Sequence, residues 1–157
     1  MDFPALAWRH AGAVAALMLC ASTAWAQAAG LKGAPAAFAA ECSSCHIGYA
    51  PALAGEAQWL GIMGGLDKHF GVDASIDGTA QQTISNWLVS HAAKGGRYAK
   101  PSADLRISTS AWFVRQHGEV GSKVWKRASI KSAANCGACH SGAARGDFDE
   151  DRVKIPQ

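Results

Sequence analysis

The sequence predicts a mainly α-helical protein built as two small domains, on three observations. Apolar residues recur at helical spacing in several segments, and no segment alternates apolar and polar residues as a strand would. Two copies of the motif Cys-x-x-Cys-His lie near opposite ends of the chain rather than in tandem, so two differently built halves are expected. Glycine, proline, serine and aspartate gather over residues 95–104, which predicts the linker between the halves.

The N-terminal segment, residues 1–26, predicts an export signal. Arg9 and His10 supply positive charge, an apolar run follows over residues 11–19, and Ala24-Trp25-Ala26 has the small-x-small cleavage pattern. We therefore expect cleavage near Ala26, which leaves a mature protein outside the cytoplasm. An uncleaved membrane anchor is the alternative, but a spanning helix needs about 20 apolar residues and this run is shorter.

The first domain is expected over residues 27–100 and the second over residues 101–157. A short helix is predicted over residues 35–45, because Pro35 suits a first turn and the alanines after it favour helix. This helix would carry the first Cys-x-x-Cys-His motif at its end.

Two further helices are predicted in the first domain, each with a histidine on its apolar face. The helix over residues 58–70 carries His69 and contains glycines, each of which costs on the order of 1 kcal/mol relative to alanine. The next begins with the capping-box pattern Thr79-Ala80-Gln81-Gln82, carries His91, and is expected to stop at Gly95-Gly96.

The second domain is predicted to contain a helix capped by Ser108 or Ser110 that carries His117 on its apolar face. A second helical stretch is expected around Trp125. The acidic tail that follows residue 146 has too little periodicity for an assignment.

The Cys-x-x-Cys-His string is the attachment site of a c-type haem. Its two thiols add to the haem vinyl groups as thioethers, and the adjacent imidazole binds the iron as the proximal ligand. The sequence therefore predicts two covalently bound haem c groups. The residues concerned are Cys42, Cys45 and His46 in the first motif, and Cys136, Cys139 and His140 in the second.

The use of cysteine agrees with this interpretation. The chain has five cysteines, and Cys20 lies in the predicted signal, so the mature chain keeps four, all of them in the motifs. A lipid anchor on Cys20 would need a small residue where Leu19 stands. Zinc also binds paired cysteines with histidines, but a histidine directly after the second cysteine is the haem pattern rather than the spaced zinc pattern.

Function then depends on the second axial ligand of each iron. Methionine there raises the reduction potential, a second histidine lowers it, and a vacant position lets small molecules bind. The mature chain offers one methionine, Met63, and three spare histidines, His69, His91 and His117. Met63 is expected in the core, and each histidine stays open as a ligand or as an ordinary partly buried side chain.

A set of short segments also occurs in a recognisable order along the mature chain. They are Glu41–His46, Tyr49–Leu53, Trp59–Met63, Leu66, His69–Ala74, Arg106-Ile107, Trp112-Phe113, His117, Asn135–His140, Gly146–Glu150 and Ile155-Pro156. This set resembles the dihaem cytochrome c family, DHC. The chain departs from the family pattern in one place, where Tyr49-Ala50-Pro51 stands for Tyr-Pro-Pro.

The resemblance implies an exported electron carrier whose first domain is similar to a small class I cytochrome c and whose second domain is less typical. It implies bis-histidine ligation of both irons, with His69 and His117 as the distal ligands, and it does not require a histidine at position 91. On domain grounds, His69 would serve the first haem and His117 the second. The resemblance also implies a membrane cytochrome b as electron donor and a soluble ligand-binding haem protein as acceptor.

These expectations favour a periplasmic electron carrier over an enzyme. If both axial positions are filled, no open coordination site remains for oxygen or peroxide chemistry, and no small-molecule substrate is required. Nucleic-acid binding is not expected in an exported haem protein, and a monomer is expected. The alternative is a small haem enzyme or gas sensor in which one iron is open or has a labile His91 or His117.

Positive charge is concentrated in the middle of the chain. The formal net charge is +3, and between Lys94 and Lys131 nine lysines and arginines stand against only Asp104 and Glu119. Such a segment could steer an acidic redox partner or offset haem propionates, and an ordinary solvated surface is the alternative.

Overall fold

The structure is a computed structural model that describes residues 31–157, so the predicted signal peptide and its cleavage site lie outside the described residues. Within this part the chain is helical, and its β-pairing is limited to two isolated bridges, which confirms the mainly α prediction. None of the described helices is long and apolar enough to span a membrane. The α-helices are α1 (Glu56–Gly64), α2 (Gly78–His91), α3 (Ala111–Gln116) and α4 (Ser122–Trp125).

Single helical turns carry much of the remaining chain. The first is a π-helical turn, η2 (Phe38–Cys42), and the others are 3-10 turns. They are η3 (Pro51–Leu53), η4 (Leu66–Lys68), η5 (Gly96–Tyr98), η6 (Ile107–Thr109), η7 (Cys136–Ala138), η8 (Ala143–Arg145) and η9 (Glu150–Arg152).

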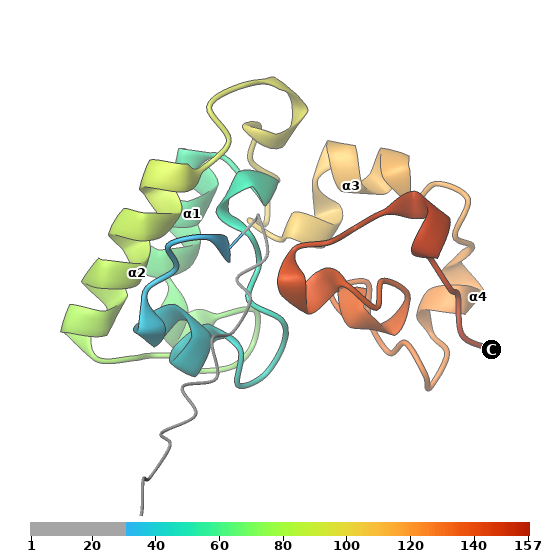
Figure 1. Ribbon diagram of the computed structural model, residues 1–157, viewed down its shortest axis with the longest axis horizontal. Helices are drawn as coiled ribbons and strands as arrows, with labels where there is room; N and C mark the ends of the chain where they lie inside the picture. The colour runs from blue at the N-terminus through green and yellow to red at the C-terminus, as the bar shows by residue number, and fades with distance from the viewer. Residues whose placement is uncertain (1–30) are drawn as a thin grey trace, which may run out of the picture.

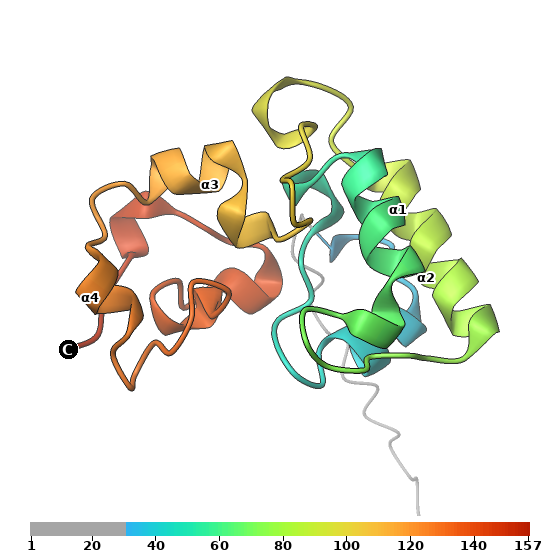
Figure 2. The same cartoon turned by 180° about the vertical axis from the view of Figure 1, so that it is seen from behind.

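The described chain forms two lobes that lie side by side (Figures 1 and 2). The N-terminal lobe, residues 31–94, contains α1 and α2, which pack against each other. The C-terminal lobe, residues 107–157, contains α3, α4 and the last 3-10 turns, and residues 95–106 join the two. The domain limits expected from the sequence stay a prediction.

The core lies mainly between α1 and α2. Trp59 and Met63 of α1 pack with Ile84 and Leu88 of α2, and all four side chains are buried. Fully burying an apolar side chain of this size contributes roughly 1.5–3 kcal/mol, so the packing of this helix pair contributes strongly to the stability of the fold. The same buried cluster continues into α3 through Phe113, which links the core to the C-terminal lobe.

The caps of α2 and α3 show how local side chains begin each helix. Ser110 accepts a hydrogen bond from the Phe113 amide at 3.4 Å, so one of the two predicted caps of α3 is confirmed. The predicted start of α2 at Thr79 is wrong, because Asp77 accepts hydrogen bonds from the amides of Thr79 and Ala80 and begins the helix two residues earlier. An aspartate carboxylate at this position satisfies amides that have no partner inside the helix.

The helix predicted over residues 58–70 is wrong in its second half. Helix α1 ends at Gly64, and after the 3-10 turn η4 the chain adopts positive φ at Phe70 (51°) and Gly71 (106°). Two consecutive glycines favour this break, because glycine loses more conformational entropy in a helix than any other residue. His69 therefore follows the 3-10 turn instead of lying on a helix face.

Gly55 is the N-cap of α1 and lies against the inter-lobe segment. A Cβ atom on Gly55 would come 2.4 Å from the Ala99 carbonyl oxygen, which is backbone and has no flexible end to move aside. Gly55 also forms a parallel bridge with Ala93. The start of α1 is thus fitted to the chain that leads towards the C-terminal lobe, at a position where only glycine has room.

Candidate haem sites

The first candidate site brings the histidine of the first motif opposite His69. His46 follows the π-helical turn that ends at Cys42, and His69 follows the 3-10 turn after α1. Their ring centroids are 6.2 Å apart, and the planes are nearly parallel, at 18°. Two segments that are distant in the sequence thus bring two imidazoles close together.

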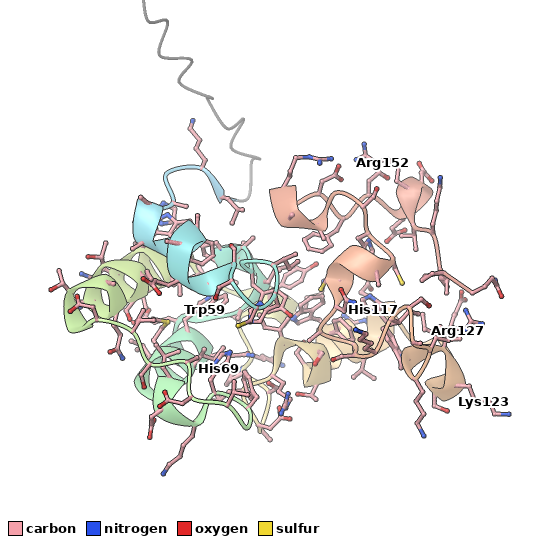
Figure 3. All side chains as sticks on the ribbon, turned by 90° about the horizontal axis from the view of Figure 1, so that it is seen from below. Trp59, His69, His117, Lys123, Arg127 and Arg152 are labelled. Carbon is pink, nitrogen blue, oxygen red and sulfur yellow. The ribbon has the colours of Figure 1, made fainter. Side chains whose placement is uncertain are left out.

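The second candidate site repeats this arrangement in the C-terminal lobe. His117 is the C-cap residue of α3, and His140 ends the second motif after the 3-10 turn η7. Their ring centroids are 6.1 Å apart, but here the planes are close to perpendicular, at 76°. Figure 3 shows His69 and His117 in different lobes, so each lobe has its own histidine pair.

Both spacings fit an iron ion between the two rings of a pair. A bond between a metal and an imidazole nitrogen is about 2.0 Å long. The centre of the ring lies roughly 1.2 Å beyond that nitrogen, from the ring bond lengths. Two imidazoles on opposite sides of one metal ion should therefore have centroids roughly 6.4 Å apart. The residues present thus fit an axial histidine pair in each lobe.

Backbone carbonyls orient one ring of each pair. The Nδ1 atom of His46 lies 2.6 Å from the Ile47 carbonyl oxygen, and that of His117 lies 2.9 Å from the Phe113 carbonyl oxygen. A carbonyl only accepts hydrogen bonds, so each Nδ1 carries the proton and donates it. The lone pair is then on Nε2, which is the arrangement that a ligating histidine requires.

The other two rings are kept neutral by their surroundings. Burial lowers the pKa of His69, and the neighbouring His46 and Arg106 lower it further. Burial and His117 likewise lower the pKa of His140, whose Nδ1 is buried and has no hydrogen-bond partner within residues 31–157. Neutral imidazole is the form that binds a metal, so both environments favour ligation.

The four motif cysteines are free thiols in the described chain. Burial, together with the charge of Glu41, raises the pKa of Cys42 to about 11. Burial also raises the pKa of Cys136 and of Cys139. Cys42, Cys136 and Cys139 therefore stay protonated near neutral pH. None of the four cysteines is used in a disulfide, so all four are available for thioether bonds.

Aromatic rings pack against all four of these imidazoles. In the N-terminal lobe Tyr49 lies against His46, with centroids 5.0 Å apart, and Phe70 lies against His69 at 4.7 Å. In the C-terminal lobe Phe113 stacks on His117, with ring centroids 4.0 Å apart and an interplanar angle of 19°. Phe148 and His140 form an edge-to-face pair with ring centroids 5.4 Å apart. Apolar contacts thus help to hold each of the four rings in place.

The C-terminal tail is tied to the second motif. The amide of Lys154 donates to the Cys139 carbonyl at 3.0 Å, and the Arg127 guanidinium donates to the Pro156 carbonyl at 2.7 Å. Arg152 pairs with Asp147 and Asp149, which fixes the turn before the tail (Figure 3 labels Arg127 and Arg152). The tail, to which the sequence analysis assigned no element, is therefore hydrogen-bonded to the second motif.

His91 lies apart from both candidate sites. It is exposed at the end of α2, where its Nδ1 lies 2.9 Å from the Trp87 carbonyl and its ring lies 5.7 Å from the Trp87 ring. His91 therefore shares a helix face with the buried Trp87, as its spacing predicted, but it is exposed at the end of that face. Met63 is buried in the core cluster, as expected from the sequence.

Sequence reasoning did not identify the aromatic partners of the histidines. Phe113 precedes His117 by four residues, the spacing at which side chains meet on a helix, so this pair could have been found from the sequence. Tyr49 and Phe148 reach their histidines through loops, and spacing alone carries no signal for such contacts. Trp125, 5.8 Å from the His117 ring, is a further neighbour of this kind.

Comparison with known proteins gives consistent matches. The family model for dihaem cytochrome c matches residues 38–148. The crystal structure of a diheme cytochrome type c from Shewanella baltica OS155 is 35% identical, covers 77% of this chain and 92% of its own, and has a TM-score of 0.68. A diheme cytochrome c structure from Rhodobacter sphaeroides is 38% identical, covers 74% of this chain and 98% of its own, and has a TM-score of 0.65. Among curated proteins, no match was found.

Proposed function

Because this chain belongs to the dihaem cytochrome c family and so carries two c-type haems, we propose that it is a periplasmic electron carrier with two bis-histidine haems. Membership of this family supports electron transfer rather than catalysis. The observation that carries the finer proposal is the pair of opposed imidazoles in each lobe, with centroids 6.2 Å and 6.1 Å apart.

In this proposal each motif histidine has a distal partner from its own lobe. His46 pairs with His69, and His140 pairs with His117. Cys42 and Cys45 would form the thioethers of the first haem, and Cys136 and Cys139 those of the second. When bound, haem iron supplies one-electron redox chemistry, and the chain holds and orients it.

The protein's contribution is to fill both axial positions and to keep the ligand rings in place. The carbonyls of Ile47 and Phe113 fix the tautomers of His46 and His117. Phe113 holds the plane of the His117 ring by stacking on it. With both positions filled, small molecules have no open site, which supports a carrier over a small haem enzyme or gas sensor.

We also propose the cellular location and the redox partners that the sequence implies. The predicted signal supports export to the periplasm. We further propose that the protein is a monomer. A membrane cytochrome b would donate electrons and a soluble haem protein would accept them, with no nucleic acid or small-molecule substrate involved. Exposed basic side chains of the C-terminal lobe, among them Lys123, Lys126 and Lys131, support an acceptor with an acidic surface (Figure 3 labels Lys123).

Raising the ionic strength is expected to slow electron transfer to an acidic acceptor, because salt screens the attraction between exposed charges. The measurement is the second-order rate constant with an acidic redox protein, taken in low and in high salt. Replacing Lys123 and Lys126 by glutamine should lower the low-salt rate constant and flatten its salt dependence. A rate constant that does not depend on salt would contradict steering by this surface.

Spectroscopy of the purified protein tests the proposed ligation. The ferric protein is expected to show two low-spin electron paramagnetic resonance signals, and the ferrous protein should form no carbon monoxide adduct. The two signals should also differ, because the imidazole planes are nearly parallel in one pair, at 18°, and nearly perpendicular in the other, at 76°. Perpendicular axial planes give the signal with the larger maximum g value.

Two results would contradict bis-histidine ligation of both haems. A high-spin ferric signal, or ready binding of carbon monoxide by the ferrous protein, would show that one axial position is open or labile. The protein would then be better described as a small haem enzyme or gas sensor.

A further inference from the structure

Tyr49 connects the two candidate haem sites directly. It lies three residues after His46, and its ring rests against the His46 ring with centroids 5.0 Å apart. Its hydroxyl donates a hydrogen bond to the Ala134 carbonyl at 2.8 Å, across 85 residues of sequence. Ala134 is two residues before Cys136, the first cysteine of the second motif. One side chain thus contacts the proximal histidine of one site and the attachment segment of the other.

The second motif offers this hydroxyl another neighbour. Burial raises the pKa of Tyr49, and the neighbouring Cys136 side chain raises it further. The single proton of the hydroxyl is donated to the Ala134 carbonyl, so the Cys136 sulfur is a close neighbour of Tyr49 and not a second acceptor. The connection from Tyr49 therefore runs through the backbone before Cys136, beside the sulfur that would bind the second haem.

Neighbouring residues hold both Tyr49 and Ala134, the two ends of this hydrogen bond, in place. On the Tyr49 side, a Cβ on Gly48 would come 2.7 Å from the Phe38 ring, and the Pro51 carbonyl accepts from the buried Trp59 indole at 2.7 Å. These contacts fix the chain immediately before and after Tyr49. The side chain therefore has a defined starting point.

On the Ala134 side, a compact turn positions the acceptor. The Asn135 side chain donates to the Ile130 carbonyl at 3.0 Å, and Ile130 is completely buried. The Ala134 amide donates to the Ser132 hydroxyl at 3.1 Å. The hydrogen bond from Tyr49 thus ends on a carbonyl whose place is set by its own neighbours.

We propose that Tyr49 is a positioning residue for electron exchange between the two haems. This inference rests on the proposed carrier function. Tyr49 fixes the relative placement of the two attachment segments and supplies a packed, hydrogen-bonded connection between them. Electron transfer through protein falls steeply with separation and with each gap between non-bonded atoms, so a bonded connection in this position speeds the exchange.

The test compares holoprotein variants of the two tyrosines in the chain. Tyr49→Phe keeps the ring on His46 and removes only the hydroxyl. Tyr98→Phe is the matched control, because the Tyr98 hydroxyl accepts from Arg97 at 3.1 Å and its ring lies against Trp112, away from both motifs. Tyr49→Leu removes the ring as well.

The measured quantity is the rate of electron exchange within half-reduced protein, taken from the broadening of haem methyl resonances in the nuclear magnetic resonance spectrum. We expect Tyr49→Phe to slow this exchange severalfold and Tyr98→Phe to leave it unchanged. Tyr49→Leu should also shift the spectroscopic signature of the first haem, because the ring that packs on His46 is lost. If Tyr49→Leu does not retain both haems, Tyr49→Phe decides alone.

Failure of the inference about Tyr49 and failure of the proposed carrier function would give different results. If Tyr49→Phe exchanges electrons as fast as the wild type, the inference about Tyr49 is overturned while the carrier function stands. If the wild type itself shows a high-spin haem or binds carbon monoxide, the proposed function fails whatever Tyr49 does.

Discussion

His117→Ala is expected to convert one of the two haems from low spin to high spin and to let its ferrous form bind carbon monoxide. His117 is the ring that faces His140, with centroids 6.1 Å apart, so its removal leaves the second iron with one protein ligand. The thioethers should retain the haem, and the space left beside Phe113 and Trp125 admits water or carbon monoxide. His69→Ala should have the same effect on the first haem.

The matched control is His91→Ala. His91 is exposed and contacts Trp87 rather than a motif, so both haems should stay low spin in this variant. The measurement is the ferric electron paramagnetic resonance spectrum, quantified for high-spin iron, with the carbon monoxide difference spectrum of the reduced protein. A high-spin haem in His91→Ala, or none in His117→Ala, would show that the ligand assignment is wrong.

Gly55→Ala is expected to lower the free energy of unfolding by about 1–3 kcal/mol, the range for inserting an extra methyl group into a packed site. The new Cβ would lie 2.4 Å from the Ala99 carbonyl oxygen, so backbone on one side has to move. That movement would shift the N-terminus of α1 relative to the segment that leads to the C-terminal lobe. Denaturant unfolding of the holoprotein, followed by far-ultraviolet circular dichroism, measures the change.

Gly64→Ala is the same substitution with the opposite expected sign. Gly64 is exposed at the end of α1, it does not have a positive φ, and nothing lies within 4 Å of a Cβ placed there. Alanine should therefore raise the free energy of unfolding by about 0.4–1 kcal/mol, by restricting the unfolded chain. Equal effects of the two substitutions would mean that the close approach to Ala99 does not constrain the fold.

The sequence predicts that α2 and α3 exist, because each has an apolar stripe and a polar residue at its start. It places both ends too late, since α2 ends at His91 instead of Gly95-Gly96 and α3 ends at Gln116, before His117. It misplaces the start of α2, since Thr79 and Asp77 are both acceptable caps and only the backbone path selects Asp77. It extends α1 too far, because apolar spacing continues to His69 while the backbone leaves the helix at Gly65, directly after Gly64. Apolar periodicity indicates which residues would share a face of a helix, but it does not show where the helix ends.

Some residues of the candidate sites could likewise be predicted from the sequence, and others could not. The motif strings identify Cys42, His46 and their counterparts without any three-dimensional information, because their chemistry depends on local spacing. From the residues alone, His69, His91 and His117 are equal candidates. Only the fold shows which of these histidines are axial-ligand candidates, because that depends on which of them lies next to a motif histidine in three dimensions. The contact between Tyr49 and Ala134 is likewise invisible in the sequence, since it is a product of how the lobes pack.

The shortness of the helices in the C-terminal lobe bears on how the protein matures. Helices α3 and α4 have six and four residues, and isolated helices below about 12–15 residues are marginal in water. The C-terminal lobe, residues 107–157, therefore depends on tertiary contacts rather than on its helices, and a covalently bound haem would supply such contacts. If haem attachment completes the folding of this lobe, chains that leave the attachment machinery without a second haem should be the ones that proteases remove. The amount of intact protein in the cell would follow the supply of haem.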